Sequence, residues 1–332
     1  MSAVAVLGAG SWGTTLADLL ARKGHEVRLW AYEPEVAETI NARHENALFL
    51  AGCPLAPGLR AFTDAGEAVA GAAVVLCAAP SQAARSVLRS VRERSPAGVL
   101  LISATKGVET QSLEFMSQVA ARELPGARFV ALSGPTFAQE VYQRQPSAIV
   151  AASADGAAAQ QAQELLATGY FRVYSNRDVL GTEIGGALKN VIAIAAGVLE
   201  GLGLGNNPRA ALITRGLAEM TRLGESLGAD SRTFAGLAGM GDLILTTCGA
   251  LSRNRALGVA LAQGESLEAY TAAHRTVAEG VHTARAAVRL AERAGIELPI
   301  SAKVSELLFQ GKPPRQAITE LMERTPKPEQ WT

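Results

Sequence analysis

The stretch Val4-Ala5-Val6-Leu7-Gly8-Ala9-Gly10-Ser11-Trp12-Gly13 decides which fold the sequence predicts. Its four apolar residues are typical of a buried strand, and the glycine motif G-x-G-x-x-G follows directly and leads into a helix. The first glycine allows a tight turn, the second lets a pyrophosphate approach the backbone, and the third lets helix and strand pack closely. Free N–H groups at the helix start favour phosphate. We therefore predict that Gly8, Gly10 and Gly13 form a dinucleotide-binding loop.

The end of the second predicted strand leaves the choice of dinucleotide open. Folds of this kind that bind NAD usually place an acidic residue there, on the ribose hydroxyls. The chain reads Trp30-Ala31-Tyr32-Glu33, so Ala31 and Tyr32 take the usual positions and Glu33 comes late. No arginine, which would favour the 2′-phosphate of NADP, stands in this stretch. The sequence thus predicts NAD or NADP and does not decide between them.

Further short apolar runs extend the pattern through the first half of the chain. They are almost continuously apolar, as expected of parallel strands buried on both faces, and Ala-rich helical stretches separate them. After about residue 176 only helical patterns follow. We predict an α/β protein, with a Rossmann-like doubly wound domain at 1–178 and an all-α domain at 179–332. The predicted strands cover 4–7, 27–30, 74–77, 99–102, 129–132, 148–150 and 171–174, and the predicted later helices cover 180–201, 207–228, 255–263, 283–294 and 301–310.

Composition excludes several classes of protein. Of the 332 residues 48% are hydrophobic, too many for a disordered chain. The 31 basic residues balance 31 acidic ones, so the basic surplus of a nucleic-acid binder is absent. Three cysteines without a C-x-x-C pair argue against a disulfide framework or a zinc site and fit the cytoplasm. The histidines have no ligand spacing, and we predict no metal site.

The apolar segment Gly185–Gly197 carries the residue most indicative of chemistry. Lys189 and Asn190 are its only strongly polar residues. A buried ammonium loses hydration unless it is paired, and burial lowers its pKa. Such a lysine is suited to donate a proton to a carbonyl group that receives a hydride. The alternative interpretation is that the side chain of Lys189 extends along the apolar surface until its ammonium reaches solvent. We interpret the surrounding stretch, 184–204, as a buried helix and not a membrane span, because polar residues interrupt it.

Other polar residues lie where an anion could bind. Lys106 follows the fourth predicted strand, where its ammonium could bind a phosphate or a carbonyl group. The alternative interpretation is that Lys106 is a solvated surface lysine. Asp242, in a glycine-rich turn, could pair with Lys189. The run Ser252-Arg253-Asn254 offers a guanidinium between a hydroxyl and an amide, a combination that suits phosphate. Surface ion pairs and helix caps are the alternatives for these last residues.

Six runs together resemble one enzyme family, the bacterial NAD(P)-dependent sn-glycerol-3-phosphate dehydrogenases. They are GAGSWGTTLA, SGPTFAQE, GALKNVIAIAAG, NPRAALITRGLAEM, GLAGMGDLILTTC and SRNRALG, and the resemblance extends from residue 4 to about 300. It implies reversible reduction of dihydroxyacetone phosphate to sn-glycerol 3-phosphate for glycerophospholipid synthesis. The loop 46–52 departs from the family's Tyr-Leu-Pro-Gly element.

The resemblance also implies roles for single residues. Lys189 would be the proton donor or acceptor at the C2 oxygen. The residues implied to bind substrate are Lys106, Gly134, Thr136, Asp242, Ser252, Arg253 and Asn254. Those implied to line the dinucleotide, besides the glycine loop, are Ser11, Trp12, Tyr32, Lys106, Ala138, Arg253, Val277 and Glu279. A 3-hydroxyacid dehydrogenase and a non-enzymatic NAD(H) sensor are the alternatives, and a homodimer through the apolar α-domain is compatible with the sequence.

Overall fold

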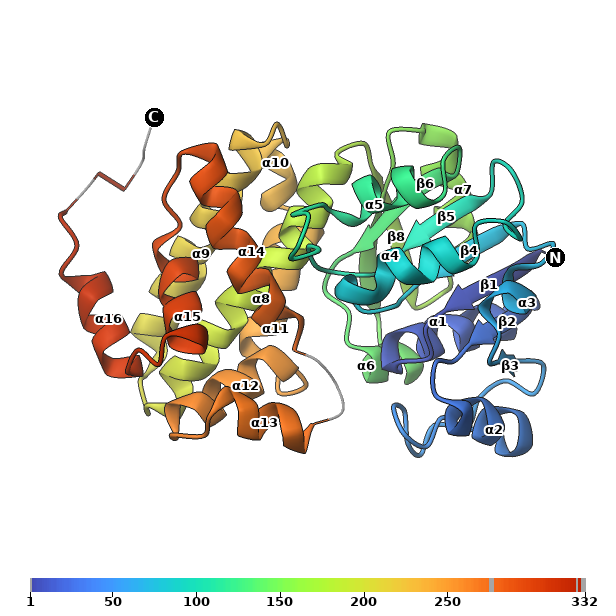
Figure 1. Ribbon diagram of the computed structural model, residues 1–332, viewed down its shortest axis with the longest axis horizontal. Coiled ribbons are helices and arrows are strands. Elements are labelled where there is room, and N and C mark those ends of the chain that lie inside the picture. The colour runs from blue at the N-terminus through green and yellow to red at the C-terminus, as the bar shows by residue number, and fades with distance from the viewer. Residues whose placement is uncertain (1, 275–277, 327, 330–332) are drawn as a thin grey trace.

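The computed structural model describes residues 2–274, 278–326 and 328–329. A sheet with its helices occupies one end of the molecule and a group of helices occupies the other (Figure 1). The last strand ends at Asn176 and the first helix of the second group begins at Val179. The predicted fold class, a Rossmann-like α/β domain followed by an all-helical domain, is confirmed.

The sheet has eight strands in the order β3-β2-β1-β4-β5-β6-β7-β8. Its strands are β1 Ala3–Leu7, β2 Glu26–Trp30, β3 Arg60–Phe62, β4 Val74–Cys77, β5 Leu100–Ser103, β6 Arg128–Ser133, β7 Ser147–Ala152 and β8 Phe171–Asn176. All neighbours are parallel except β6 and β7, so the expectation that the apolar runs form parallel strands was wrong at this one pair. Strand β3 was not predicted because its three residues form no apolar run.

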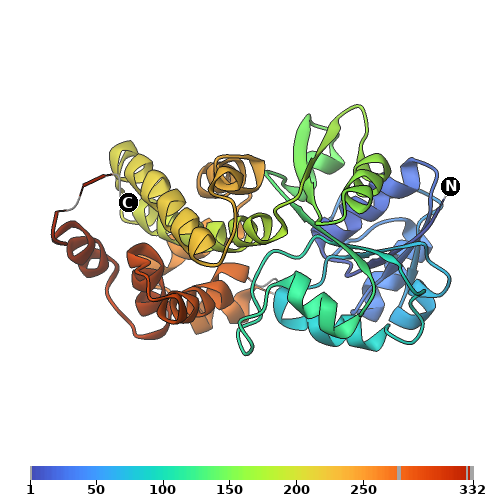
Figure 2. The same ribbon diagram turned by 90° about the horizontal axis from the view of Figure 1, so that it is seen from above.

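Both faces of the sheet are covered by helices, as Figure 2 shows. Along β1, Val4 and Val6 belong to one apolar cluster, whereas Ala5 and Leu7 belong to the cluster on the opposite face. Each strand thus buries side chains on both sides, which is why its sequence is almost continuously apolar. The helices of this part are α1 Ser11–Arg22, α2 Pro34–Arg43, α3 Ala65–Val69, α4 Ser81–Ser90, α5 Met116–Glu123, α6 Ala138–Tyr142 and α7 Gly156–Leu166.

Helix α8, Val179–Gly201, is the centre of the helical domain. The other elements are α9 Asn206–Ser226, α10 Ser231–Phe234, the π-helical turn η1 Leu237–Gly241, α11 Asp242–Cys248, α12 Arg253–Ala262, α13 Leu267–Ala273, α14 Glu279–Ala294, α15 Pro299–Phe309 and α16 Pro314–Met322. All the helices predicted after residue 178 are present, with ends within a few residues of their expected positions. The elements that the prediction omitted are short, because one or two turns give little periodic signal.

Helix α8 is long and apolar enough to cross a membrane by length and composition alone. In the described structure, however, 83% of its most apolar window is buried inside the protein. Its apolar side chains belong to the clusters that hold the helical domain together, with Ile184, Leu188 and Ile192 in one and Val191 and Ile194 in another. The apolar run is therefore explained by packing inside the protein.

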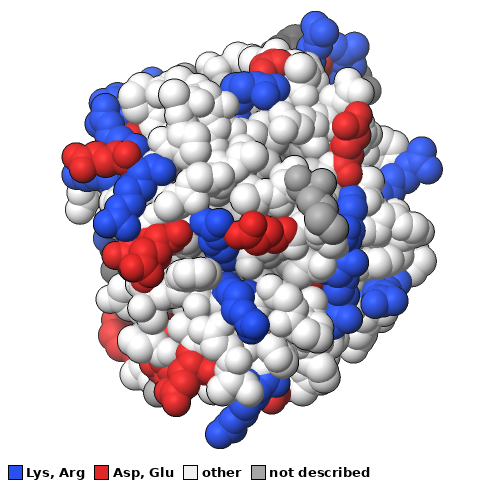
Figure 3. All heavy atoms as spheres, turned by 90° about the vertical axis from the view of Figure 1, so that its right-hand side faces the viewer, with Lys and Arg blue, Asp and Glu red and all other residues white. Residues whose placement is uncertain are grey.

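The outer face of the sheet domain carries acidic and basic side chains interspersed among uncharged atoms (Figure 3). This distribution accompanies the equal numbers of basic and acidic residues in the chain.

Helices α8 and α12 cross with backbone against backbone. A Cβ atom added at Gly197 would lie 1.9 Å from the carbonyl oxygen of Arg255, and one added at Gly258 would lie 2.0 Å from that of Ile194. No side chain fits in either gap, because a methyl group and a main-chain oxygen need well over 3 Å. Glycine at these positions sets the distance between the two helices, and hence the position of the start of α12.

We predict that Gly197→Ala lowers the free energy of unfolding by about 3 kcal/mol or more, since the backbone of α12 must shift to admit the methyl group. Chemical denaturation monitored by circular dichroism measures this change. Gly156→Ala is the matched control, because a Cβ there meets open space and alanine favours the helix. Equal stability of the two variants would show that the helix crossing tolerates a side chain.

Candidate active site

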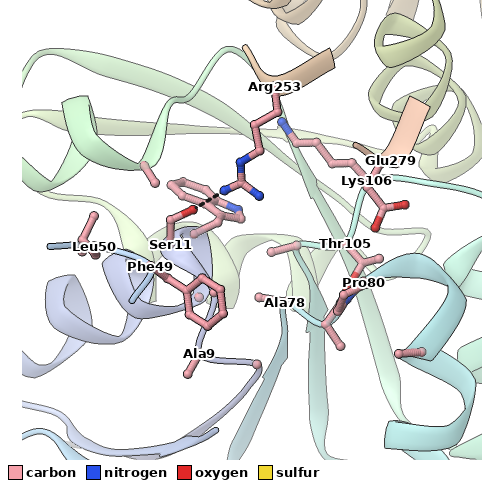
Figure 4. A pocket seen from close by; sticks show the side chains of 18 of the residues that line it. Ala9, Ser11, Phe49, Leu50, Ala78, Pro80, Thr105, Lys106, Arg253 and Glu279 are labelled. Atoms are coloured by element: carbon pink, nitrogen blue, oxygen red, sulfur yellow. Dashed lines mark hydrogen bonds between the residues drawn. The ribbon is translucent and has the colours of Figure 1, made fainter. Parts of the chain in front are cut away.

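The candidate site is a cavity of about 960 Å³ between the carboxyl ends of the first strands and the helical domain. Its walls come from the glycine loop, from the segments that follow β2, β4 and β5, and from α8, α11, α12 and α14 (Figure 4). In open α/β sheets this edge is where ligands bind, because the loops after the strands converge there. The site therefore lies where the fold predicts it.

The glycine loop joins β1 to α1 at one end of the cavity, and all of Gly8–Gly13 line it. Gly8 has a φ of +111°, which a residue with a side chain rarely adopts, and a Cβ at Gly13 would lie 1.9 Å from the carbonyl oxygen of Gly8. Backbone geometry thus requires glycine at positions 8 and 13, whereas a Cβ at Gly10 would meet no described atom within 4 Å. The side chain of buried Asn46 donates to the carbonyl oxygen of Ala9 at 2.7 Å and so holds the loop in place. The sequence gave Asn46 no such role.

Two lysines share one buried carboxylate at the other end of the cavity. Lys189 Nζ lies 2.6 Å from Asp242 Oδ1, and Lys106 Nζ lies 2.6 Å from Asp242 Oδ2. Lys189 also donates to Thr246 Oγ1 at 2.8 Å, and Lys106 donates to the carbonyl oxygen of Gly134 at 2.9 Å. The sequence suggested the pairing of Lys189 with Asp242, but gave no sign that Lys106 joins the same carboxylate or that Thr246 contacts the lysine.

Burial and, to a smaller extent, the nearby ammonium of Lys106 lower the pKa of Lys189 to about 8, although the carboxylate of Asp242 acts in the opposite direction. The amine can therefore gain and lose a proton near neutral pH. A group of this kind is suited to general acid–base chemistry at an oxygen that faces the cavity.

Close packing around the start of α8 brings these groups together. A Cβ at Gly185 would lie 2.4 Å from the carbonyl oxygen of Ala238 in η1, so the π-helical turn rests directly on α8. Asp242 is the first residue of α11 and follows that turn immediately. On the next residue of α8, a Cβ at Gly186 would lie 2.6 Å from Ser133 Oγ at the end of β6. The pair Gly185-Gly186 thus lets the acid and the sheet approach Lys189.

Arg253 crosses the cavity from the helical domain to the glycine loop. It is the first residue of α12, and its guanidinium donates to Ser11 Oγ at 2.7 Å, the dashed line in Figure 4. Burial lowers the pKa of Arg253, although a guanidinium stays charged. Its neighbour Asn254 donates to Asn190 Oδ1 at 2.9 Å and accepts from the N–H of Gly280, which ties α12 to α8 and α14. Ser252 caps α12 by accepting from the N–H of Arg255.

Two carboxylates of the helical domain bind the first turns of helices in the sheet domain. Glu279 accepts from the N–H and the hydroxyl of Ser81 on α4, at 3.0 and 2.5 Å. Glu183 on α8 accepts from the N–H and the hydroxyl of Ser117 on α5, at 2.8 and 2.6 Å. Burial raises the pKa of both carboxyl groups, to about 7 for Glu183. The two domains are therefore joined at helix N-termini, where negative charge is favourable.

The remaining residues named from the sequence have different positions. Thr136 and Ala138 line the cavity, and Trp12 lines it while packing against the core at Phe171. Tyr32 lines the cavity and is 78% exposed. Val277 lies outside the described residues. Residues that line the cavity without having been given a site role from the sequence include Glu33, Phe49, Asn190, Thr246 and Leu251.

Comparison with known proteins identifies the family. The model of the NAD-dependent glycerol-3-phosphate dehydrogenase N-terminus matches residues 3–159, and that of the C-terminus of the same enzymes matches residues 178–319. The chain belongs to this family. A relative from Geobacter metallireducens named glycerol-3-phosphate dehydrogenase [NAD(P)+] is 56% identical over 98% of each chain. One of the same name from Rhodospirillum rubrum is 52% identical over 97% of this chain and 92% of its own.

Solved structures agree with this assignment. The crystal structure of glycerol-3-phosphate dehydrogenase from Coxiella burnetii has a TM-score of 0.94 and 39% identity, covering 97% of this chain and 98% of that one. The glycerol-3-phosphate dehydrogenase of Saccharomyces cerevisiae has a TM-score of 0.81 and 30% identity, covering 96% and 99%. The family resemblance stated from the six sequence runs is thus confirmed over nearly the whole chain.

We predict that Asp242→Asn destabilises the protein by about 3–5 kcal/mol, because it leaves the buried ammonium of Lys189 and the partly buried ammonium of Lys106 without a counter-charge. Urea denaturation at neutral pH measures the loss. Asp230→Asn is the control, since that carboxylate forms an exposed pair with Arg232, and an exposed pair contributes little to stability. If Asp242→Asn were as stable as its control, the shared carboxylate would not be holding the lysines in place.

Proposed function

We propose that this chain catalyses the reversible NAD(P)H-dependent reduction of dihydroxyacetone phosphate to sn-glycerol 3-phosphate, with Lys189 as general acid and base. The observation that carries the proposal is that the ion-paired amine of Lys189 and the glycine loop line one cavity. The activity named for the relatives supports it. The product is the backbone of glycerophospholipids, and the absence of disulfides among the three free cysteines supports a cytoplasmic enzyme.

The cavity fits a nicotinamide dinucleotide. A Cβ added at Gly10, the N-cap of α1, would meet no described atom within 4 Å, so the space beside the backbone at the start of α1 is open to a pyrophosphate. Ser11, Trp12, Tyr32 and Ala138 line the cavity between this loop and the lysines, together with Lys106, Arg253 and Glu279. When bound, the reduced dinucleotide supplies the hydride. We propose that residues 1–178 bind the dinucleotide and that residues 179–332 bind the substrate.

The polar residues of this chain then have distinct tasks. The ammonium of Lys189 donates its proton to the C2 oxygen of the substrate as negative charge develops there, and Asp242 holds the ammonium in position. Lys106 contributes a second positive charge to the same place. Arg253, with Ser252 and Asn254 beside it, binds the phosphate and so orients the carbonyl. Thr136 lines the cavity on the sheet side. Gly134 is not among the residues that line the cavity, and its carbonyl oxygen accepts from Lys106, so its role toward the substrate is to hold that ammonium.

Replacing Lys189 tests the central role. Lys189→Met keeps the length and apolar stem of the side chain and removes the proton, so turnover should fall about 10²–10⁴-fold. Tryptophan fluorescence should show nearly unchanged binding of the reduced dinucleotide. Turnover close to that of the wild type would contradict the proposal.

The pH dependence gives the second half of this test. Because reduction needs the ammonium form, kcat/KM for dihydroxyacetone phosphate should fall as the pH rises through about 8. Oxidation of sn-glycerol 3-phosphate needs the neutral amine, so its kcat/KM should rise through the same pH. Profiles that change in the same direction for both reactions would exclude Lys189 as the titrating group.

Arg253→Ala should raise KM for dihydroxyacetone phosphate about 10- to 100-fold, since a charge-assisted phosphate contact is worth about 1.5–3 kcal/mol. Initial-rate kinetics with saturating dinucleotide measure the change. Arg232→Ala is the control, because that guanidinium is paired with Asp230 at the surface. The phosphate-binding role would be wrong if the wild type used unphosphorylated dihydroxyacetone equally well.

A further inference from the structure

The end of β2 lies directly beside the glycine loop. Trp30, its last residue, is paired with Leu7, and its carbonyl oxygen accepts from the N–H of Gly8 at 3.1 Å. Tyr32 and Glu33 follow within three residues, and both line the same cavity as the loop. A dinucleotide whose pyrophosphate rests on the glycine loop has its adenosine ribose at this strand end. Glu33, which the sequence placed late, is therefore within the site.

The carboxylate of Glu33 is available to a ligand. It stands at the N-cap of α2 but its side chain does not cap that helix, and within the described part of the chain it has no hydrogen-bond or ion-pair partner. The helix offers little to offset its charge. Pro34 removes one N–H from the first turn, and Glu35 adds a second negative charge there.

The positive charges of the cavity lie elsewhere. Among the described residues that line it, the cations are Lys106, Lys189 and Arg253. Both lysines are bound to Asp242, and the arginine is bound to Ser11 at the glycine loop. Around the end of β2 the described lining is instead aromatic, apolar or acidic, with Trp30, Tyr32, Glu33, Phe49 and Leu50.

We propose that Glu33 accepts hydrogen bonds from the 2′- and 3′-hydroxyl groups of the adenosine ribose and makes this enzyme selective for NAD(H) over NADP(H). A carboxylate has two oxygens and suits a pair of adjacent hydroxyl donors. The 2′-phosphate of NADP(H) removes one donor and places a dianion against that carboxylate, with no described cation of the lining beside it to compensate. The inference rests on the dinucleotide site of the proposed function and assigns a residue to the choice that the sequence left open.

Equilibrium binding without substrate tests the inference. Titration of the full-length protein with NADH and with NADPH, followed by quenching of tryptophan fluorescence, should show NADH binding at least about tenfold more tightly. In Glu33→Gln the ratio should shrink to about threefold or less, because NADH loses a charged acceptor and NADPH loses a repulsion. Glu38→Gln makes the same change of charge on the exposed side of α2 and should keep the wild-type ratio.

Three results would overturn the selectivity: wild-type NADPH binding as tight as NADH binding, an unchanged ratio in Glu33→Gln, or an equal change in Glu38→Gln. Rates of dihydroxyacetone phosphate reduction with each dinucleotide separate this failure from failure of the proposed function. If neither dinucleotide supports reduction while NADH still binds selectively, the reaction is wrong and the role of Glu33 stands. If both support it with equal kcat/KM and equal affinity, the reaction stands and the role of Glu33 is wrong.

Discussion

The structure around the site depends on one buried carboxylate that is shared by two ammonium groups. Asp242 neutralises part of the charge of Lys189 and Lys106, one from the helical domain and one from the sheet domain. Without it, two positive charges would face each other in a region of low dielectric, where like charges repel strongly. With it, the cavity keeps a net positive charge at one end. That charge is what an anionic substrate requires, and the whole-chain balance of zero conceals it.

Close backbone packing makes this arrangement possible. Gly185 and Gly186 let the π-helical turn and the end of β6 reach α8, and Gly197 lets α12 lie against the same helix. The sheet, the acid and the arginine-bearing helix are all positioned by a single buried helix. The apolar residues and the glycines of α8 together allow several elements to pack around Lys189.

The sequence predicted the parts of this structure that local patterns encode. Continuous apolar runs marked the strands other than β3, and the loop Gly8–Gly13 marked the dinucleotide end of the site. The sequence did not reveal contacts between distant segments, because the residues that make them belong to no recognisable motif. Thr246 is a threonine in a short helix, and only folding brings its hydroxyl to Lys189. Strand β3 and the antiparallel direction of β7 relative to β6 were not predicted, because three residues form no pattern and strand direction leaves no mark in a buried run.

The serine contacts of Glu183 and Glu279 have a consequence for motion. Glu183 binds the second turn of α8 to α5, so the start of α8 should move together with the sheet domain. The rest of α8 forms the core of the helical domain. A helix is stiff along its axis, and Lys189 follows Glu183 by less than two turns. The distance from this amine to the glycine loop is therefore set by rigid elements. Helix α12 packs backbone against backbone on the same helix, so the guanidinium of Arg253 is held by the same rigid unit as the amine of Lys189.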